Sequence, residues 1–249
     1  MSVKRNELIK FCQDYLRIDK FADYCHNGLQ VEGVDKIDRI ITGVSFSQAL
    51  IEKAIEKKAQ MIIVHHGIFG DAIGKGPVIK DFTRNRLKLL LANDINLVGF
   101  HLPLDAHPLI GNNISLCRLL GVRDPKPFDV GFIGQLDKDI NIAEFIKLVD
   151  KKLNTRSTAV LGGKKKIKKI GVISGGSSSD FVVAASLGAD TFLCGELKEY
   201  IVRAAEEMNM NVINAGHYNT EKLGVQNLGN LIAKKFKVKV EFVDIPCEI

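Results

Sequence analysis

Short apolar runs alternate with amphipathic segments along the chain, and this alternation predicts the fold class. Runs with the length and content of buried strands occupy residues 37–44, 61–64 and 95–100. Residues at helical spacing fill the segments between and after them, and helices are predicted over residues 48–58, 82–92 and 113–120. Strands that alternate with helices favour an α/β fold whose sheet is largely parallel.

The N-terminus and the second half of the chain complete this picture. A first helix is predicted up to residue 16 with Asn6 as its cap, followed by a loop over residues 26–33. Later segments predict a strand at 132–136, a helix at 142–153, and a hairpin of strands 158–161 and 167–174 across Gly162-Gly163. Two prolines and a composition shift mark residues 125–131 as the boundary. Two lobes are therefore expected, 1–125 and 126–249.

An internal repeat supports the division into two lobes. Residues 39–67 align without a gap with residues 169–197, as strand, loop, helix, small polar turn and strand. Residues 95–105 then align with residues 211–221, which pairs His101 with His217 and Asp105 with Glu221. A chance alignment does not readily explain why a histidine and an acid match at equal spacing in both copies. We therefore expect two duplicated α/β lobes that face each other across a metal-binding cleft.

Polar residues follow the apolar strands in both copies, where an α/β sheet holds its ligands. Four of the six histidines lie at these strand ends: His65, His66, His101 and His217. Imidazoles together with carboxylates suit zinc, manganese, iron or nickel, and a carboxylate can bridge two cations. Neighbours in a strand point to opposite faces, so a turn beginning at Gly67 would let His65 and His66 reach two different ions. The pattern predicts two divalent metal ions per chain.

Four motifs occur in order along nearly the whole chain: NGLQVEG, the apolar strand into HHG, HLPLD and GHYNTEKLG. Together they resemble the Nif-three-like family, whose bacterial members are often labelled GTP cyclohydrolase 1 type 2 homologues. The resemblance implies that the family's dinuclear metal ligands are His65, His66, Asp105, His217 and Glu221. It also implies a two-lobed fold without an inserted domain, assembled as a toroidal homohexamer with metal sites facing an internal cavity. Many members carry an acid near the position of Cys25-His26, which is a departure here.

Two hypotheses of function belong to different classes. The first is a metal-dependent hydrolase acting on a nucleotide or related heterocycle, as the family label suggests, with two cations that activate water. The alternative is a non-catalytic ring-shaped scaffold or metal-handling protein that binds nucleic acid or a protein partner. Five protein ligands shared by two metals leave coordination positions open, which favours an enzyme. His101 either moves a proton, orients a ligand from the second shell, or is structural.

Composition and charge indicate which partners the protein can bind and in which compartment it works. The net charge is +6, and much of the excess lies in KKKIKK, residues 164–169, which is either a solvated turn or a phosphate-binding patch. Five scattered cysteines without a CxxC pair argue against disulfides and against a cysteine-ligated zinc site. The N-terminus lacks an apolar signal region, and no apolar run approaches the ~20 residues of a spanning helix. We expect a cytoplasmic protein.

Weaker candidates remain outside the main pattern. Residues 70–77, GDAIGKGP, lack the spacing of a P-loop. Residues 174–180, SGGSSSD, either cap a helix or offer N–H groups to a phosphate. Glu196 either lines the cleft or forms a surface ion pair, whereas Cys194 is expected in the core. Asn27, Gly28 and Gln30 either border the site or form a structural turn.

Overall fold

The computed structural model describes residues 2–68 and 78–247, and the chain forms two compact units. Unit 1 combines Met1–Leu104 with Gly224–Ile245, and unit 2 combines Asp105–Leu223 with Pro246–Ile249. Two helices cross this division, α4 (Leu102–Ala106) and α9 (His217–Phe236). Within the two described ranges, no helix has the length and apolar content needed to span a bilayer.

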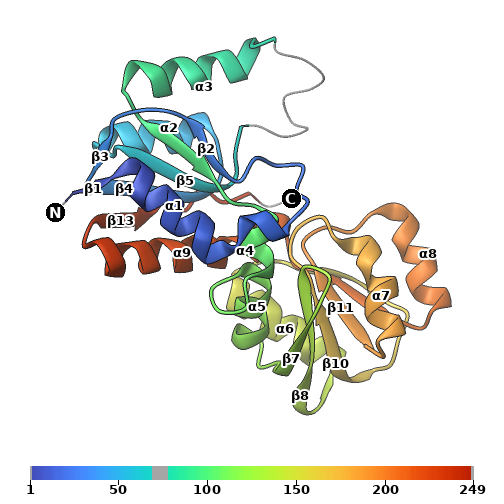
Figure 1. The fold of residues 1–249 in the computed structure, drawn as a ribbon. Helices are drawn as coiled ribbons and strands as arrows, with labels where there is room; N and C mark the ends of the chain where they lie inside the picture. The colour runs from blue at the N-terminus through green and yellow to red at the C-terminus, as the bar shows by residue number, and fades with distance from the viewer. Residues whose placement is uncertain (1, 69–77, 248–249) are drawn as a thin grey trace. The chain divides into compact units, whose positions relative to one another are not determined.

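A five-stranded sheet in the order β13-β4-β5-β6-β2 forms the centre of unit 1 (Figure 1). Its strands are β2 (Gly28–Val31), β4 (Arg39–Ser45), β5 (Met61–His66), β6 (Asn96–Gly99) and β13 (Lys239–Phe242). Neighbours are parallel except for β2, which is antiparallel to β6. The other elements of unit 1 are the paired strands β1 (Val3–Lys4) and β3 (Lys36–Ile37), the short 3₁₀ helix η1 (Ile18–Lys20), α1 (Arg5–Leu16), α2 (Gln48–Glu56) and α3 (Asp81–Ala92).

The apolar runs of unit 1 become central strands because both faces of the sheet are covered. All four residues from Met61 to Val64 are fully buried, although neighbouring side chains of a strand point to opposite faces. The Ser47 side chain accepts a hydrogen bond from the N–H of Leu50 and so begins α2. The carboxyl end of β5 is where the buried apolar residues give way to His65 and His66.

A six-stranded mixed sheet in the order β7-β8-β10-β11-β12-β9 forms the centre of unit 2. Its strands are β7 (Arg123–Phe128), β8 (Gly131–Asn141), β9 (Thr158–Leu161), β10 (Lys166–Val172), β11 (Thr191–Cys194) and β12 (Asn211–Asn214). The parallel strands β10, β11 and β12 lie between antiparallel neighbours. Its helices are α5 (Asn112–Leu119), α6 (Ile142–Leu153), η3 (Ser178–Asp180), α7 (Phe181–Ser186) and α8 (Glu199–Glu207).

The units differ from the expected lobes, 1–125 and 126–249, at both ends of the chain. Residues 125–131, expected to be a boundary, contain most of β7, an edge strand in which proline is tolerated. Helix α5 belongs to unit 2 because Ile114, Leu116 and Cys117 pack in one cluster with residues of α6. The C-terminal strand β13 pairs with β4, which places it in unit 1. Long-range packing, not the local prolines, sets the division.

The hairpin predicted across Gly162-Gly163 is wrong. β9 pairs with β12, whereas β10 pairs with β8 and β11. A Cβ at Gly162 would lie 2.7 Å from the Cα of Glu206, and one at Gly163 would lie 2.8 Å from the carbonyl oxygen of Asn209. The two glycines therefore allow backbone segments to pack closely, which is a different use of glycine from a tight turn.

Two smaller expectations also differ. The segment 26–33, predicted as a loop, contains β2, a short edge strand that is recognisable only through its pairing with β6. Asn6 lies within the first turn of α1, where its Oδ1 accepts a hydrogen bond from Arg5, and Lys4 occupies the cap position.

Both units build the same core and brace it with the same hydrogen bonds. β4, β5 and β6 repeat the parallel order of β10, β11 and β12. A fully buried asparagine begins the third strand in each unit, Asn96 in β6 and Asn211 in β12. Asn96 bonds to the main chain of Gly33, Val34 and Gln60. Asn211 bonds to the matching groups of Gly163, Lys164 and Asp190.

The antiparallel edge strands match as well, but the connections that precede them do not. Gly28 lies opposite Gly99 in unit 1, and Thr158 lies opposite Asn214 in unit 2. The connection between α1 and β2 covers residues 17–27, whereas the connection between α6 and β9 covers only residues 154–157. Unit 1 therefore has the longer connection in front of its antiparallel edge strand, beside the carboxyl end of β6.

Candidate metal-binding residues

His65 is the most enclosed of the histidines at the carboxyl ends of the unit 1 strands. It is fully buried at the end of β5, and its Nδ1 lies 3.0 Å from the carbonyl oxygen of Phe100. A carbonyl can only accept a hydrogen bond, so Nδ1 carries the proton and donates it. In the neutral imidazole, which metal binding requires, the lone pair is then on Nε2.

His66 is the last residue of β5, so the prediction that a turn at Gly67 redirects the two histidines is wrong. His66 is half-buried, and its Nδ1 lies 3.0 Å from the Oγ of Ser45 on β4. The ring centroids of His65 and His66 are 4.6 Å apart, with an interplanar angle of 54°. Two rings on successive positions of a strand end therefore lie side by side.

His101 joins these two imidazoles from the end of β6. It is buried, and one ligand nitrogen from each of His65, His66 and His101 lies within 4.8 Å of the others. Its Nδ1 is 2.9 Å from Oδ1 of Asp23, and its main-chain N–H donates to Oδ1 of Asn27. The residues around NGLQ thus border the histidines of unit 1.

Asp23 is a residue of this site that the sequence patterns did not reveal. Its side chain is 2 % exposed, and it accepts hydrogen bonds from His101 and from the main-chain N–H groups of Cys25 and Leu102. Burial alone would raise the pKa of Asp23, but the bonds from His101, Asn27 and Cys25 outweigh it and lower the pKa to about 2. Asp23 lies two positions before Cys25, close to the place where the lack of an acid was noted as a departure from the family pattern.

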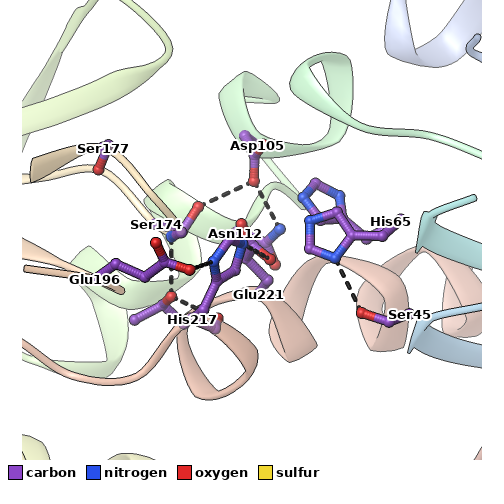
Figure 2. A network of polar contacts seen from close by, with 12 residues as sticks. Ser45, His65, Asp105, Asn112, Ser174, Ser177, Glu196, His217 and Glu221 are labelled. Carbon is purple, nitrogen blue, oxygen red and sulfur yellow. Dashed lines mark hydrogen bonds and ion pairs between the residues drawn. The ribbon is translucent and has the colours of Figure 1, made fainter. Parts of the chain in front are cut away.

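Asp105 lies in unit 2, where two neighbours hold its carboxylate (Figure 2). Its Oδ1 accepts a hydrogen bond of 2.8 Å from Asn112 and one of 3.0 Å from the hydroxyl of Ser174. All three side chains are buried. Ser174 comes from the SGGSSSD segment, which thus contacts a carboxylate of the chain itself.

His217 lies between two carboxylates of unit 2, as Figure 2 shows. Its Nδ1 is 2.5 Å from Glu196 Oε1, and its Nε2 is 3.0 Å from Glu221 Oε2, one helical turn along α9. Burial alone would lower the pKa of His217, but Glu221 and Glu196 outweigh it and raise the pKa to about 9. Glu196 is therefore a partner of a candidate ligand.

The backbone at Gly175 packs closely against Glu221 and His217. Its φ is +63°, and a Cβ there would lie 2.2 Å from Oε1 of Glu221 and 3.0 Å from Nε2 of His217. Glycine is needed both for the left-handed backbone and for the space that the two side chains fill. The loop after β10 is therefore shaped around the candidate ligands.

The structure corrects one part of the internal repeat. Phe100 N–H bonds to Val64 in unit 1, and Ala215 N–H bonds to Cys194 at the matching place in unit 2. His101 directly follows Phe100, whereas Gly216 separates Ala215 from His217. The pairing of His101 with His217, and of Asp105 with Glu221, is thus one residue out of step with the strands.

Each unit offers a donor set that could hold divalent cations. Unit 1 supplies imidazoles, and unit 2 supplies carboxylates together with one imidazole. One carboxylate oxygen of Asp105 and one of Glu221 lie within 4.8 Å of each other. Two buried carboxylates at this separation favour a bound cation, because like charges otherwise repel in a poorly hydrated place. Nitrogen and oxygen donors of these types suit zinc, manganese, iron and nickel.

The weaker candidates are placed as follows. Residues 70–77 lie outside the described residues. Cys194 is fully buried, and burial raises the pKa of its thiol to about 12, which fits the expected core position. Lys164, Lys165, Lys166 and Lys168 are exposed around the start of β10.

The chain is similar to a known family and to named relatives over nearly its whole length. A family profile described as Duf34/NIF3 (NGG1p interacting factor 3) matches residues 3–248. A Haemophilus influenzae protein named GTP cyclohydrolase 1 type 2 homolog is 40% identical over 245 residues, covering 96% of this chain and 97% of that protein. A Pseudomonas aeruginosa protein of the same name is 38% identical and covers 99% of both chains.

Solved structures agree with these matches in fold. A protein described as ybgI, of unknown function, superimposes with a TM-score of 0.94 at 37% identity, covering 99% of this chain and 100% of that chain. TTHA1606 from Thermus thermophilus superimposes with a TM-score of 0.91 at 34% identity and the same coverage. With the family match over nearly the whole length, the chain belongs to the Duf34/NIF3 family.

Proposed function

We propose that the chain binds two divalent metal ions through His65, His66, Asp105, His217 and Glu221. The main support for this proposal is that hydrogen bonds and close packing hold the donor atoms in place within each unit. In unit 1, the Phe100 carbonyl fixes His65 with its Nε2 lone pair available for a metal. In unit 2, Gly175 leaves space for Glu221 and His217, which lie against each other.

We further propose that the metal-loaded protein is a hydrolase acting on a nucleotide or a related heterocycle. Bound divalent cations supply a more acidic water and polarise the bond that the water attacks. The support for this reaction class is the name of the relatives, GTP cyclohydrolase 1 type 2 homolog, at 40% identity. The chain's own residues orient the ligands: Ser45 holds His66, Asn112 and Ser174 hold Asp105, and Glu196 holds His217.

His101 is proposed to act beside the metals in moving a proton, with Asp23 as the residue that positions it. The Asp23 carboxylate accepts from Nδ1 of His101, which leaves Nε2 as a proton acceptor on the side of His65 and His66. His101→Ala should then keep the metal content and lower turnover by roughly 10²–10⁴-fold, as for a lost general acid or base. Loss of metal together with activity would instead make His101 a ligand.

Elemental analysis of desalted protein tests the metal proposal directly. After loading with zinc or manganese, the wild type should hold close to two ions per chain, and His66→Ala or Glu221→Ala should lose most of this content. His26→Ala is the matched control, because His26 is an exposed histidine of unit 1 outside the ligand set. Wild-type content in the His65→Ala/His217→Ala double variant would refute the ligand assignment.

A panel of nucleotides, phosphoesters and cyclic amides tests the reaction class. The metal-loaded wild type should consume at least one member, and Glu221→Ala should not. The alternative function is a non-catalytic scaffold or metal-handling protein with a nucleic-acid or protein partner, favoured by the exposed lysines around the start of β10. Metal binding without any turnover, together with salt-dependent binding of RNA or DNA, would support that alternative.

We also propose that the chain assembles as a homohexamer and works in the cytoplasm. The assembly rests on the family to which the chain belongs, and the location on five cysteines that are all free. Light scattering should report a species of six chains, and a mass near 27.5 kDa at working concentration would refute the assembly.

A further inference from the structure

A polar cavity of about 550 Å³ lies in unit 2, beside the start of α9. Except for one glycine, every residue of its wall carries a side chain that can form hydrogen bonds, and the wall contains no acid. The lining residues are Asn154, Thr155, Arg156, Thr158, Asn214, Gly216 and Asn219. None of them belongs to the proposed metal ligands, so the cavity raises a separate question of what it binds.

Most acceptors of the wall are already used. Asn214 Oδ1 accepts from the main-chain N–H of Gly216, and Asn219 Oδ1 accepts from Nζ of Lys222. Because an N–H and an ammonium can only donate, these bonds identify the amide oxygens and so the amide nitrogens. The nitrogen of Asn214 donates to the hydroxyl of Thr158, and the nitrogen of Asn219 donates to the hydroxyl of Thr155.

The wall therefore presents donors. A hydroxyl that accepts a hydrogen bond still has its own O–H to give, so Thr155 and Thr158 can both donate into the cavity. The Arg156 side chain is exposed and forms no hydrogen bond or ion pair with any residue in the described ranges. A guanidinium with five N–H donors and two free O–H groups match a ligand that is rich in acceptors and negatively charged.

In unit 1, residues of the chain itself occupy the position that corresponds to this cavity. The cavity lies where β9 pairs with the end of β12, and β2 pairs with the end of β6 at the matching place, although the β2–β6 pairing shifts register between Leu29 and Val31. In unit 1, the longer connection of residues 17–27 brings the carboxylate of Asp23 to the end of β6, where it accepts from the Leu102 N–H at the start of α4. The short connection of residues 154–157 brings no such carboxylate to unit 2, and the lining there contains none.

We propose that this corner of unit 2 binds a small phosphomonoester, with the phosphate group on Arg156, Thr155 and Thr158. The volume admits a sugar phosphate or a nucleoside monophosphate, which is within the usual range of small-molecule pockets. The remaining amides of the wall, from Asn154, Asn214 and Asn219, suit the polar groups of the rest of the ligand. The site needs no metal, so it goes beyond the proposed hydrolase function.

Titration calorimetry with ribose 5-phosphate, ribose and inorganic phosphate tests the proposal. The wild type should bind ribose 5-phosphate best, inorganic phosphate more weakly, and uncharged ribose weakest. Arg156→Met should weaken ribose 5-phosphate binding by about ten- to a hundredfold, the usual effect of a lost charge-assisted hydrogen-bond pair. Thr158→Val keeps the shape and removes one donor, so it should weaken binding by about five- to tenfold. Arg156 and Thr158 are exposed, so both variants should fold.

Two controls separate this site from the metals. Arg203→Met removes an exposed arginine of the same unit that pairs with Glu206 outside the cavity, and it should bind like the wild type. The His66→Ala/Glu221→Ala variant should lose metal and keep ribose 5-phosphate binding. Equal binding of ribose and ribose 5-phosphate, unchanged binding by Arg156→Met, or binding lost with the metals would each overturn the proposal. If no metal binds to the wild type but Arg156 remains essential, only the metal proposal fails.

Discussion

The two units build the same strand core and place different chemistry at its carboxyl end. Unit 1 ends its strands in imidazoles, with His65, His66 and His101 near one another. Unit 2 ends them in carboxylates around one imidazole, with Glu196 and Glu221 on His217. Both nevertheless begin the third strand with a buried asparagine that makes the same three contacts. The comparison shows that this fold fixes the strand starts tightly and leaves the strand ends free to vary.

This asymmetry follows from what each end must do. At the amino end, the main chain has partly buried N–H and C=O groups that need partners, and an asparagine satisfies both kinds at once. At the carboxyl end, His65 and His66 are the last residues of β5, whereas His101 and His217 follow the ends of β6 and β12, and their own neighbours constrain them. Imidazoles and carboxylates are both ligand types of zinc, manganese, iron and nickel, so each unit keeps donors that suit a divalent cation.

The largest expected effect tests the shared part of the comparison. Asn96→Ala and Asn211→Ala should each lower the free energy of unfolding of the affected unit by about 3 kcal/mol, because each removes three side-chain hydrogen bonds to the main chain that contribute about 1 kcal/mol apiece. Denaturant unfolding combined with hydrogen exchange can assign the loss to a unit. Asn93→Ala is the control: Asn93 is exposed, so this change should stay within about 0.5 kcal/mol. Strongly unequal effects at the two buried positions would break the comparison.

The sequence predicts the central elements of both units better than it predicts contacts between distant segments. Apolar periodicity predicted most central strands and helices, since burial on both faces leaves a continuous apolar run in β5 and burial of one face leaves helical spacing in α6. The candidate ligands were predictable because histidines and acids gather after strands. Asp23 and the true partners of β9 were not, because they depend on contacts between residues far apart in sequence. The one-residue offset at Gly216 escaped notice because apolar strands align almost equally well in either register.

The next expected effect concerns Asp23, whose carboxylate has no counterpart in the short connection of unit 2, residues 154–157. The folded state holds the pKa of Asp23 at about 2, below the ordinary value, so ionised Asp23 stabilises unit 1 at pH values above about 4. This stability is lost as the pH falls through about 2, where the carboxyl protonates in both states. Asp23→Asn should therefore cost about 2 kcal/mol at pH 7 and almost nothing near pH 2. Equal unfolding free energies of wild type and variant at pH 7 would contradict this account.

A glycine pair in unit 2 separates backbone strain from an effect on the candidate ligands. Gly175 and Gly188 both have positive φ, at +63° and +83°, so alanine at either should cost about 1 kcal/mol. Only Gly175 lies against Glu221, whereas a Cβ at Gly188 would meet only the end of Lys169. Gly175→Ala should in addition weaken metal binding by roughly tenfold or more. Metal titrations that give the same affinity for both variants would show that the Gly175 backbone does not shape a metal site.

The smallest effects concern the two serines that hold candidate ligands, one in each unit. Ser174 donates to Asp105 from a buried position, while Ser45 lies beside His66 on the exposed end of β4. Water can replace the hydroxyl of Ser45 but not that of Ser174, so the cost of removal should differ. Ser174→Ala should lose about 1 kcal/mol of stability and about tenfold in metal affinity, whereas Ser45→Ala should lose only about twofold in affinity. Metal titrations on matched preparations measure this, and a larger loss for Ser45 would mean that the imidazoles of unit 1 need more support than the carboxylates of unit 2.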